Sequence, residues 1–173
     1  MAVKTVAFDP FSTQRPGTGG LRRPTREFIQ PHYAQGFIQA AIDQIKDGGG
    51  RIDTWVIGSD GRFPGREMLP SIVKILIANG AKKIIAANAD FVSTTPAVSN
   101  LIIKHRADGG FMLSASHNPG GIDGDFGIKI ETSRGGQPGD GFNAPLALRA
   151  ASNGRYLAED IGDGEALERV EFA

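Results

Sequence analysis

The chain has 173 residues, which is long enough for one domain with a hydrophobic core. Its 19 Lys and Arg residues balance 19 Asp and Glu residues, and this zero formal charge argues against non-specific binding to nucleic acids or anionic membranes. The absence of cysteine excludes disulfides, thiolate metal sites and a cysteine nucleophile. The sequence has neither an apolar N-terminal leader nor a run of the ~18 apolar residues of a membrane span, so we expect a cytoplasmic protein.

Apolar segments of strand length alternate with amphipathic segments of helix length along the first 115 residues. Four segments predict strands: 3–8, 54–58, 83–87 and 109–114. Three segments predict helices, one opened by Pro31, one at 66–79, and one with Thr95 as its N-cap and Pro96 in its first turn. This alternation predicts an α/β fold, a three-layer α/β/α domain with a mostly parallel sheet.

The end of the chain departs from this pattern. The stretch between residue 114 and the next predicted strand, near residues 123–130, is too short for a crossover helix, so that strand is expected to be antiparallel and the sheet mixed. Residues 144–151 predict a short helix, and the sequence from Tyr156 onward is acidic. We therefore expect residues 1–136 to form the domain core and residues 137–173 to form a peripheral helix and an acidic tail or linker.

Glycine is unusually frequent, with 24 of 173 residues, about twice its usual share. The glycines gather in loops, which is typical of tight turns, of flexible linkers and of backbone that comes close to a ligand. The loop from Arg15 to Arg23 combines glycines with arginines. Exposed backbone N–H groups beside guanidinium groups suit a phosphate, although the loop lacks the Gly-Lys-Ser/Thr ending of a P-loop.

Polar side chains follow two of the predicted strands. The strand at 109–114 leads into a polar, glycine-rich turn that contains Ser116 and His117. Loops after strand ends carry the chemistry of open α/β sheets, so Ser116 is either a nucleophile or an ordinary turn residue. Asp60, in the turn after strand 54–58, could hold a ligand or orient Arg62, and a role in stabilising the turn is favoured over a catalytic one.

Five motifs, taken together and in this order, resemble the first domain of the α-D-phosphohexomutases, and within that family they are most similar to the phosphoglucomutases. These motifs are Pro16–Arg22, Gly58–Arg62, Ser93–Ala97, Ser114–Gly121 and Gly124–Lys129. The resemblance covers about residues 3–136, and the segment around Ser116 is its most specific part. The chain departs from the family at Gly19, where Ser is common, and at Ser114, where Thr is common.

The resemblance implies an isomerase that acts as an intramolecular phosphotransferase. Ser116 would carry a phosphoryl group and exchange it with glucose 1-phosphate or glucose 6-phosphate through glucose 1,6-bisphosphate. Lys129 would be the general acid/base, Arg22 would support it and the phosphate, and His117 would line the site. The implied phosphate- and substrate-binding residues are Thr18, Arg22, Ser116, His117, Asn118 and Lys129.

The resemblance also implies a Mg²⁺ ion held by the phosphate on Ser116 and by an aspartate-rich loop of a second domain. We find no such loop, because Asp123 and Asp125 belong to the segment before the returning strand. Family members have four domains, so we expect a truncated mutase that is inactive or nearly so without domains 2–4. The alternatives are a mannose- or glucosamine-phosphate mutase and a non-enzymatic relative that uses this fold for binding.

Overall fold

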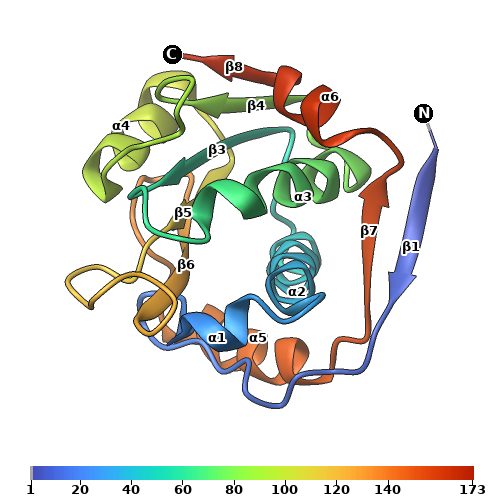
Figure 1. Ribbon diagram of the computed structural model, residues 1–173. Coiled ribbons are helices and arrows are strands. Elements are labelled where there is room, and N and C mark those ends of the chain that lie inside the picture. Colours follow the sequence, from blue (N-terminus) through green and yellow to red (C-terminus); the bar gives the residue numbers. More distant parts are fainter. Residues whose placement is uncertain (1) are drawn as a thin grey trace.

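The computed structural model describes residues 2–173, and its centre is a six-stranded sheet (Figure 1). The strand order is β2-β6-β5-β3-β4-β8. These strands are β2 (Leu21–Pro24), β3 (Thr54–Ser59), β4 (Lys83–Ala86), β5 (Gly109–Leu113), β6 (Asp125–Thr132) and β8 (Val170–Phe172). β5, β3, β4 and β8 run parallel, whereas β6 is antiparallel to β5 and β2 is antiparallel to β6. The predicted mixed, mostly parallel sheet is therefore confirmed.

Helices cover both faces of the sheet, which confirms the predicted three-layer arrangement. The larger core contains side chains from five helices: α1 (Thr25–Phe28), α2 (Tyr33–Asp47), α3 (Gly65–Ala78), α5 (Asp140–Ser152) and α6 (Asp163–Glu168). On the opposite face, α4 (Thr95–His105) packs Val98 and Ile102 against Val56 and Met112 of the sheet. None of the helices within residues 2–173 has the length and apolar character needed to cross a membrane.

The first residues of α2 and α4 differ from those predicted. α2 begins at Tyr33 instead of Pro31, because His32 has a φ of 72° and this left-handed backbone cannot continue a helix. α4 begins at Thr95, and its N-cap is Thr94, whose side-chain oxygen accepts a hydrogen bond from the N–H of Ala97 at 3.4 Å. In both cases the helical pattern was predicted correctly and the first residue was wrong.

The predicted loop at residues 15–23 is shorter than expected, because its last residues form β2. Leu21 is 1% exposed and lies in the larger core. β2 pairs with β6 in the register Leu21↔Ile128 and Arg22↔Gly127. The four-residue helix α1 follows directly and was also not predicted. These short elements are stabilised by contacts with distant residues, which local sequence patterns do not report.

The C-terminal segment differs from the tail that its acidic composition predicted. β7 (Arg155–Glu159) pairs antiparallel with β1 (Val3–Ala7), and this separate two-stranded sheet lies beside α3 at the edge of the molecule (Figure 1). α6 follows β7, and β8 then joins the main sheet beside β4. Most charged side chains of these elements face solvent, Glu159 being the buried exception, so composition alone could not reveal the strands. The division of the chain at residue 136 stays a prediction.

The weakly patterned helix α5 allows a direct test of its packing. Leu146 is fully buried, whereas Leu148, two residues later on the same helix, is 77% exposed. We expect Leu146→Ala to lower the free energy of unfolding by about 2–5 kcal/mol, because it leaves a cavity in the core. The same change at Leu148 should cost less than about 0.5 kcal/mol. Urea denaturation of both variants measures this, and equal losses would show that α5 does not pack as described.

Candidate functional site

The loop between β5 and β6, residues 114–124, is called the serine loop. Ser114 and Ala115 are buried at its start, and Ser116 and His117 are exposed. The hydroxyl oxygen of Ser114 accepts a hydrogen bond from the N–H of Ser116 at 3.0 Å. Ser116 has a φ of 56°, an uncommon left-handed conformation for a residue with a side chain. Such local strain persists only where the surroundings hold it, and it is concentrated at functional sites.

Arg62 holds the serine loop in place. Its guanidinium group donates hydrogen bonds to the carbonyl oxygens of Ser116 at 2.8 Å, Asn118 at 3.2 Å and Asp125 at 2.9 Å. The carboxylate of Asp60 in turn accepts from Nε of Arg62 at 2.8 and 3.0 Å. The side chain of Arg62 is only 11% exposed, so these charge-assisted bonds are largely shielded from water.

This geometry decides between the two interpretations of Asp60. Its carboxylate accepts from the N–H of Arg62 at 3.1 Å within the turn and also binds the Arg62 guanidinium group. The favoured role of Asp60 in stabilising the turn is therefore confirmed, and of the two contacts left open, that with Arg62 is present. The three bonds from Arg62 to the serine loop and to the first residue of β6 were not predicted. The sequence signal was the motif Gly58–Arg62, but its target lies more than fifty residues away.

Asn118 connects the serine loop to β2 and β6. Its side-chain oxygen accepts from Nη1 of Arg22 at 3.2 Å, and its side-chain nitrogen donates to Oδ2 of Asp125 at 2.5 Å. The amide therefore orients Arg22 from β2 while it is fixed by Asp125 at the start of β6. Both functional ends of the amide are thus already bonded within the protein.

Lys129 lies at the base of the serine loop. It is opposite Met112 in the pairing of β5 with β6, is half-buried, and donates from Nζ to Oγ1 of Thr95 at 3.3 Å. Gly20 packs directly against this strand: it has a φ of 104°, and a Cβ there would lie 2.3 Å from the carbonyl oxygen of Ile128. A residue other than glycine would therefore displace the preceding loop from Lys129.

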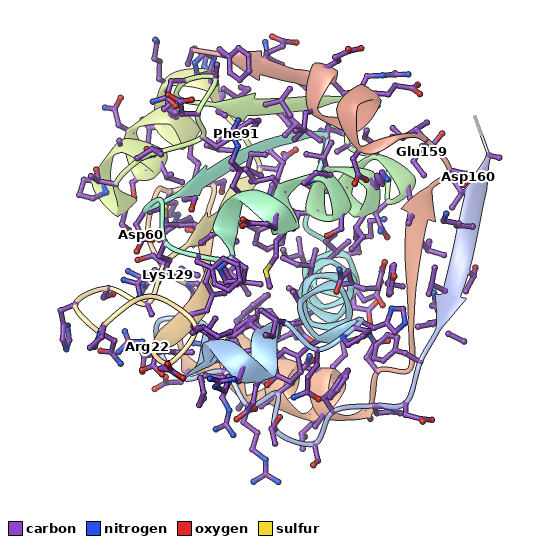
Figure 2. All side chains as sticks on the ribbon, viewed as in Figure 1. Arg22, Asp60, Phe91, Lys129, Glu159 and Asp160 are labelled. Atoms are coloured by element: carbon purple, nitrogen blue, oxygen red, sulfur yellow. The ribbon has the colours of Figure 1, made fainter. Side chains whose placement is uncertain are left out.

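Residues 15–20, here called the glycine loop, form one wall of a pocket of about 280 Å³. The pocket is lined by Arg15, Gly17, Gly19, Gly20, Leu21, Arg22, Ser114 and Lys129. Two of the predicted site residues, Arg22 and Lys129, meet in it. Ser116, His117 and Asn118 are on the neighbouring serine loop, and Thr18 is exposed within the glycine loop. Figure 2 shows Arg22, Lys129 and Asp60 on the same side of the molecule, next to the serine loop.

The carboxylates near the serine loop are occupied by positively charged or amide partners. Asp60 binds Arg62, Asp125 accepts from Asn118, and Asp123 forms an ion pair with Arg26 at 2.6 Å. Across residues 2–173 there is no group of three or more His, Asp or Glu side chains arranged to hold a metal ion. The described residues therefore do not form a complete metal-binding set.

The comparisons with known proteins agree with this arrangement. The sequence model described as "Phosphoglucomutase/phosphomannomutase, alpha/beta/alpha domain I" matches residues 13–153. The chain belongs to this family. It is 39% identical over 161 residues to a phosphoglucomutase of Rhizobium radiobacter, covering 93% of this chain and 29% of that protein. A phosphoglucomutase of Emericella nidulans is 45% identical over 135 residues, which cover 78% of this chain and 24% of the relative.

Structural similarity extends over nearly the whole chain. The open form of the exocytosis-sensitive phosphoprotein pp63/parafusin, a phosphoglucomutase from Paramecium, superposes with a TM-score of 0.88 at 31% identity. The match covers 95% of this chain and 30% of that structure. The chain thus spans less than a third of the length of these relatives. The α/β/α fold is that of the family's first domain, as the motifs from residue 16 to residue 129 predicted.

The role of Arg62 predicts a local effect of its removal. We expect Arg62→Ala to cost about 1–3 kcal/mol of unfolding free energy, because three carbonyls lose their guanidinium donor and the Asp60 carboxylate loses its ion-pair partner. Amide hydrogen exchange in residues 114–124 should accelerate more than in β3 or β4. Arg66→Ala is the matched control, because that side chain is 72% exposed and forms an ion pair at 3.7 Å with Asp90, which is also exposed. Unchanged exchange in the serine loop would contradict the role of Arg62.

Glu131 predicts a pH dependence of stability. It is 1% exposed, and its removal from water raises the pKa of its carboxyl group, an effect that the charge of Lys129 partly offsets. A raised folded-state pKa means that the folded protein binds the proton more tightly. The tighter proton binding by Glu131 in the folded state stabilises the fold. This stabilisation is complete below the ordinary carboxyl pKa of 4.5 and is lost as the pH rises through the pKa of Glu131 in the folded protein.

We therefore expect the unfolding free energy of the wild type to fall relative to that of Glu131→Gln as the pH rises from below 4.5 to neutrality. Urea denaturation of both proteins across this pH range measures the difference between their unfolding free energies. Taking the difference removes the contributions of the other titrating groups, which the two proteins share. Parallel pH profiles of the two proteins would show that Glu131 titrates normally in the folded state.

Proposed function

We propose that this chain is the phosphoserine domain of a mutase that interconverts glucose 1-phosphate and glucose 6-phosphate. Ser116 carries a phosphoryl group and exchanges it with the hexose phosphate through glucose 1,6-bisphosphate. The observation that carries this proposal is the exposed Ser116, held by Arg62 beside a pocket with Arg22 and Lys129 in its wall. The relatives that match nearly the whole chain at about 40% identity are phosphoglucomutases, which favours glucose as the sugar.

Each predicted residue has a role that its position supports. When Ser116 takes a phosphoryl group from the bisphosphate, a bond forms between its Oγ and phosphorus and the bond from phosphorus to the sugar oxygen breaks. Lys129 donates a proton to Oγ as general acid when the phosphoryl group leaves Ser116, and as general base it takes this proton back when Ser116 is phosphorylated again. The sugar hydroxyl that receives the phosphoryl group loses its proton, and the sugar oxygen released in the return step regains one. Arg22 neutralises charge on the phosphoryl oxygens, which is the main demand of phosphoryl transfer.

The remaining residues of the set act around this centre. His117 and Thr18 are exposed on the serine and glycine loops, where they are available to a sugar or phosphate group. Asn118 acts by orienting Arg22, because its amide already bonds both Arg22 and Asp125. Asn118 is thus a positioning residue in this proposal: it orients the guanidinium group of Arg22, and Arg22 contacts the substrate.

The family's chemistry requires a divalent cation, for which we propose Mg²⁺. When bound, it supplies Lewis-acid stabilisation of the transferring phosphoryl group. This chain would contribute one ligand, a phosphate oxygen on Ser116, since the carboxylates around the serine loop are bonded to other groups. The other ligands would come from outside this chain.

The chain's relatives are about three times as long as the matched segment, so the complete reaction needs further domains. We propose that domains 2–4 of the parent mutase supply the remaining metal ligands, the sugar-recognition loop and the distal phosphate site. The chain alone would then be inactive or nearly so. Phosphoglucomutases of pea and potato are named cytoplasmic, and we propose the same location here.

A labelling experiment tests the proposal. The chain is incubated with glucose 1,6-bisphosphate and Mg²⁺, alone and with the domains of a phosphoglucomutase relative that lie outside the matched segment. Intact-mass analysis and peptide mapping should find one phosphate on Ser116 in the completed sample and none or little in the chain alone. Ser116→Ala should abolish the label, whereas Ser133→Ala, an exposed serine outside the serine loop, should retain it. No phosphate on Ser116 in either sample would favour a non-enzymatic binding role.

A further inference from the structure

The pocket beside the serine loop contains a third cation to which neither the motifs nor the comparisons assign a role. Arg15 lines it together with Arg22 and Lys129. Arg15 and Arg22 are seven residues apart, and the glycine loop between them is closed by two hydrogen bonds, from the N–H of Gly17 to the carbonyl of Gly20 at 3.0 Å and in reverse at 3.2 Å. This closure brings both arginines to the same pocket.

The backbone in front of Arg15 is anchored to the core. Gln14 is 1% exposed, and its side-chain nitrogen donates to the carbonyl oxygen of Tyr33 at 2.5 Å. The N–H of Arg15 itself donates to the carbonyl of Thr13 at 2.8 Å. The exposed side chain of Arg15 therefore extends from a fixed point, so that ordering it on a ligand requires no rearrangement of the backbone.

The charges around the pocket are not balanced within the protein. Of the four arginines in residues 15–26, the two outside the pocket are paired with carboxylates: Arg23 with Glu27 at 3.1 Å and Arg26 with Asp123 at 2.6 Å. Within residues 2–173, no carboxylate lies within ion-pair distance of Arg15, Arg22 or Lys129. Three uncompensated cations around one small pocket favour a multiply charged anion.

The glycine loop also has free backbone donors, one of them at Gly19 in the pocket lining. The N–H groups of Thr18 and Gly19 make no backbone hydrogen bond within the described chain, unlike those of Gly17 and Gly20. Successive free N–H groups in a turn form a concave site for anions. The chemistry of the pocket is therefore that of a phosphate site with arginine on two sides.

We propose that Arg15 is a phosphate-binding residue of this site, which binds oxygens of the phosphoryl group from the side opposite the serine loop. The inference rests on the proposed function for the identity of that group, a phosphate of a hexose phosphate. It extends the predicted set of Arg22 and Lys129 by one residue. A guanidinium group suits this role because its planar N–H groups bind two phosphate oxygens at once.

The test uses the 173-residue chain with inorganic phosphate and, separately, glucose 6-phosphate as probes. Binding is followed by amide chemical shifts in residues 15–20 and by calorimetry. The wild type should bind phosphate, and Arg15→Gln should weaken binding roughly tenfold, the effect of one charge-assisted hydrogen bond. Arg15→Lys should bind between the two, because it keeps the charge and loses the two-pronged contact.

Arg51→Gln is the matched control, since Arg51 is exposed, is bonded to Asp53 and does not line the pocket. This variant should bind phosphate as the wild type does, and circular dichroism should show that all variants are folded. Equal phosphate affinity in Arg15→Gln and the wild type would overturn the role of Arg15. The absence of saturable phosphate binding by the wild type would overturn it as well. Neither result bears on labelling of Ser116 in the completed protein, so the two proposals fail separately.

Discussion

The antiparallel pairing of β5 with β6 is the interaction on which the candidate site depends. The register Leu113↔Ile128 fixes both ends of the serine loop and places Lys129 at its base. Gly127 lies at the most crowded point, where a Cβ would be 2.5 Å from the carbonyl oxygen of Ser114 and 3.0 Å from that of Leu21. Three backbone segments can therefore meet there only because residue 127 has no side chain. This close approach brings the glycine loop and the start of the serine loop, at Ser114, to one pocket.

Cations at this site divide into two groups with different tasks. Arg62 is bound to the carboxylate of Asp60 and to backbone carbonyls, and Arg26 is bound to the carboxylate of Asp123, so their charge stabilises the loops. Arg15, Arg22 and Lys129 surround the pocket without a carboxylate partner within the described chain. An arginine in an ion pair stabilises a loop and adds no net charge to the site. A cation without a carboxylate partner leaves a positive charge, which attracts an anionic ligand. The shape of the site and its affinity for phosphate thus come from separate side chains.

The sequence predicted the fold wherever a local pattern determines the structure. Apolar runs and helical spacing identified β3, α3, β4 and β5, and the short connection after residue 114 predicted the antiparallel β6. The pattern could not identify β2, β7 or β8, because each depends on a partner strand far away in the chain. β8 has three residues and β2 has four, too few for alternation to be recognised.

The same division applies to the candidate site. Family motifs identified Ser116, Lys129 and Arg22 from sequence alone, and the structure brings Arg22 and Lys129 into one pocket beside the serine loop. The motifs did not predict the contact of Arg62 with the serine loop, because its partners there are backbone carbonyls and a carbonyl group is present at every residue. Arg15 was part of the predicted phosphate loop, but only the folded chain shows that it shares a pocket with Lys129.

A chase experiment on labelled Ser116 tests the central claim most directly. The chain is completed with the other domains of a relative, phosphorylated with labelled glucose 1,6-bisphosphate, freed of excess label and mixed with glucose 6-phosphate. If Ser116 is the phosphoryl carrier, the label should leave the protein and appear in glucose 1,6-bisphosphate within a single turnover. Label that remains on Ser116, or that is released only as inorganic phosphate, would contradict the account.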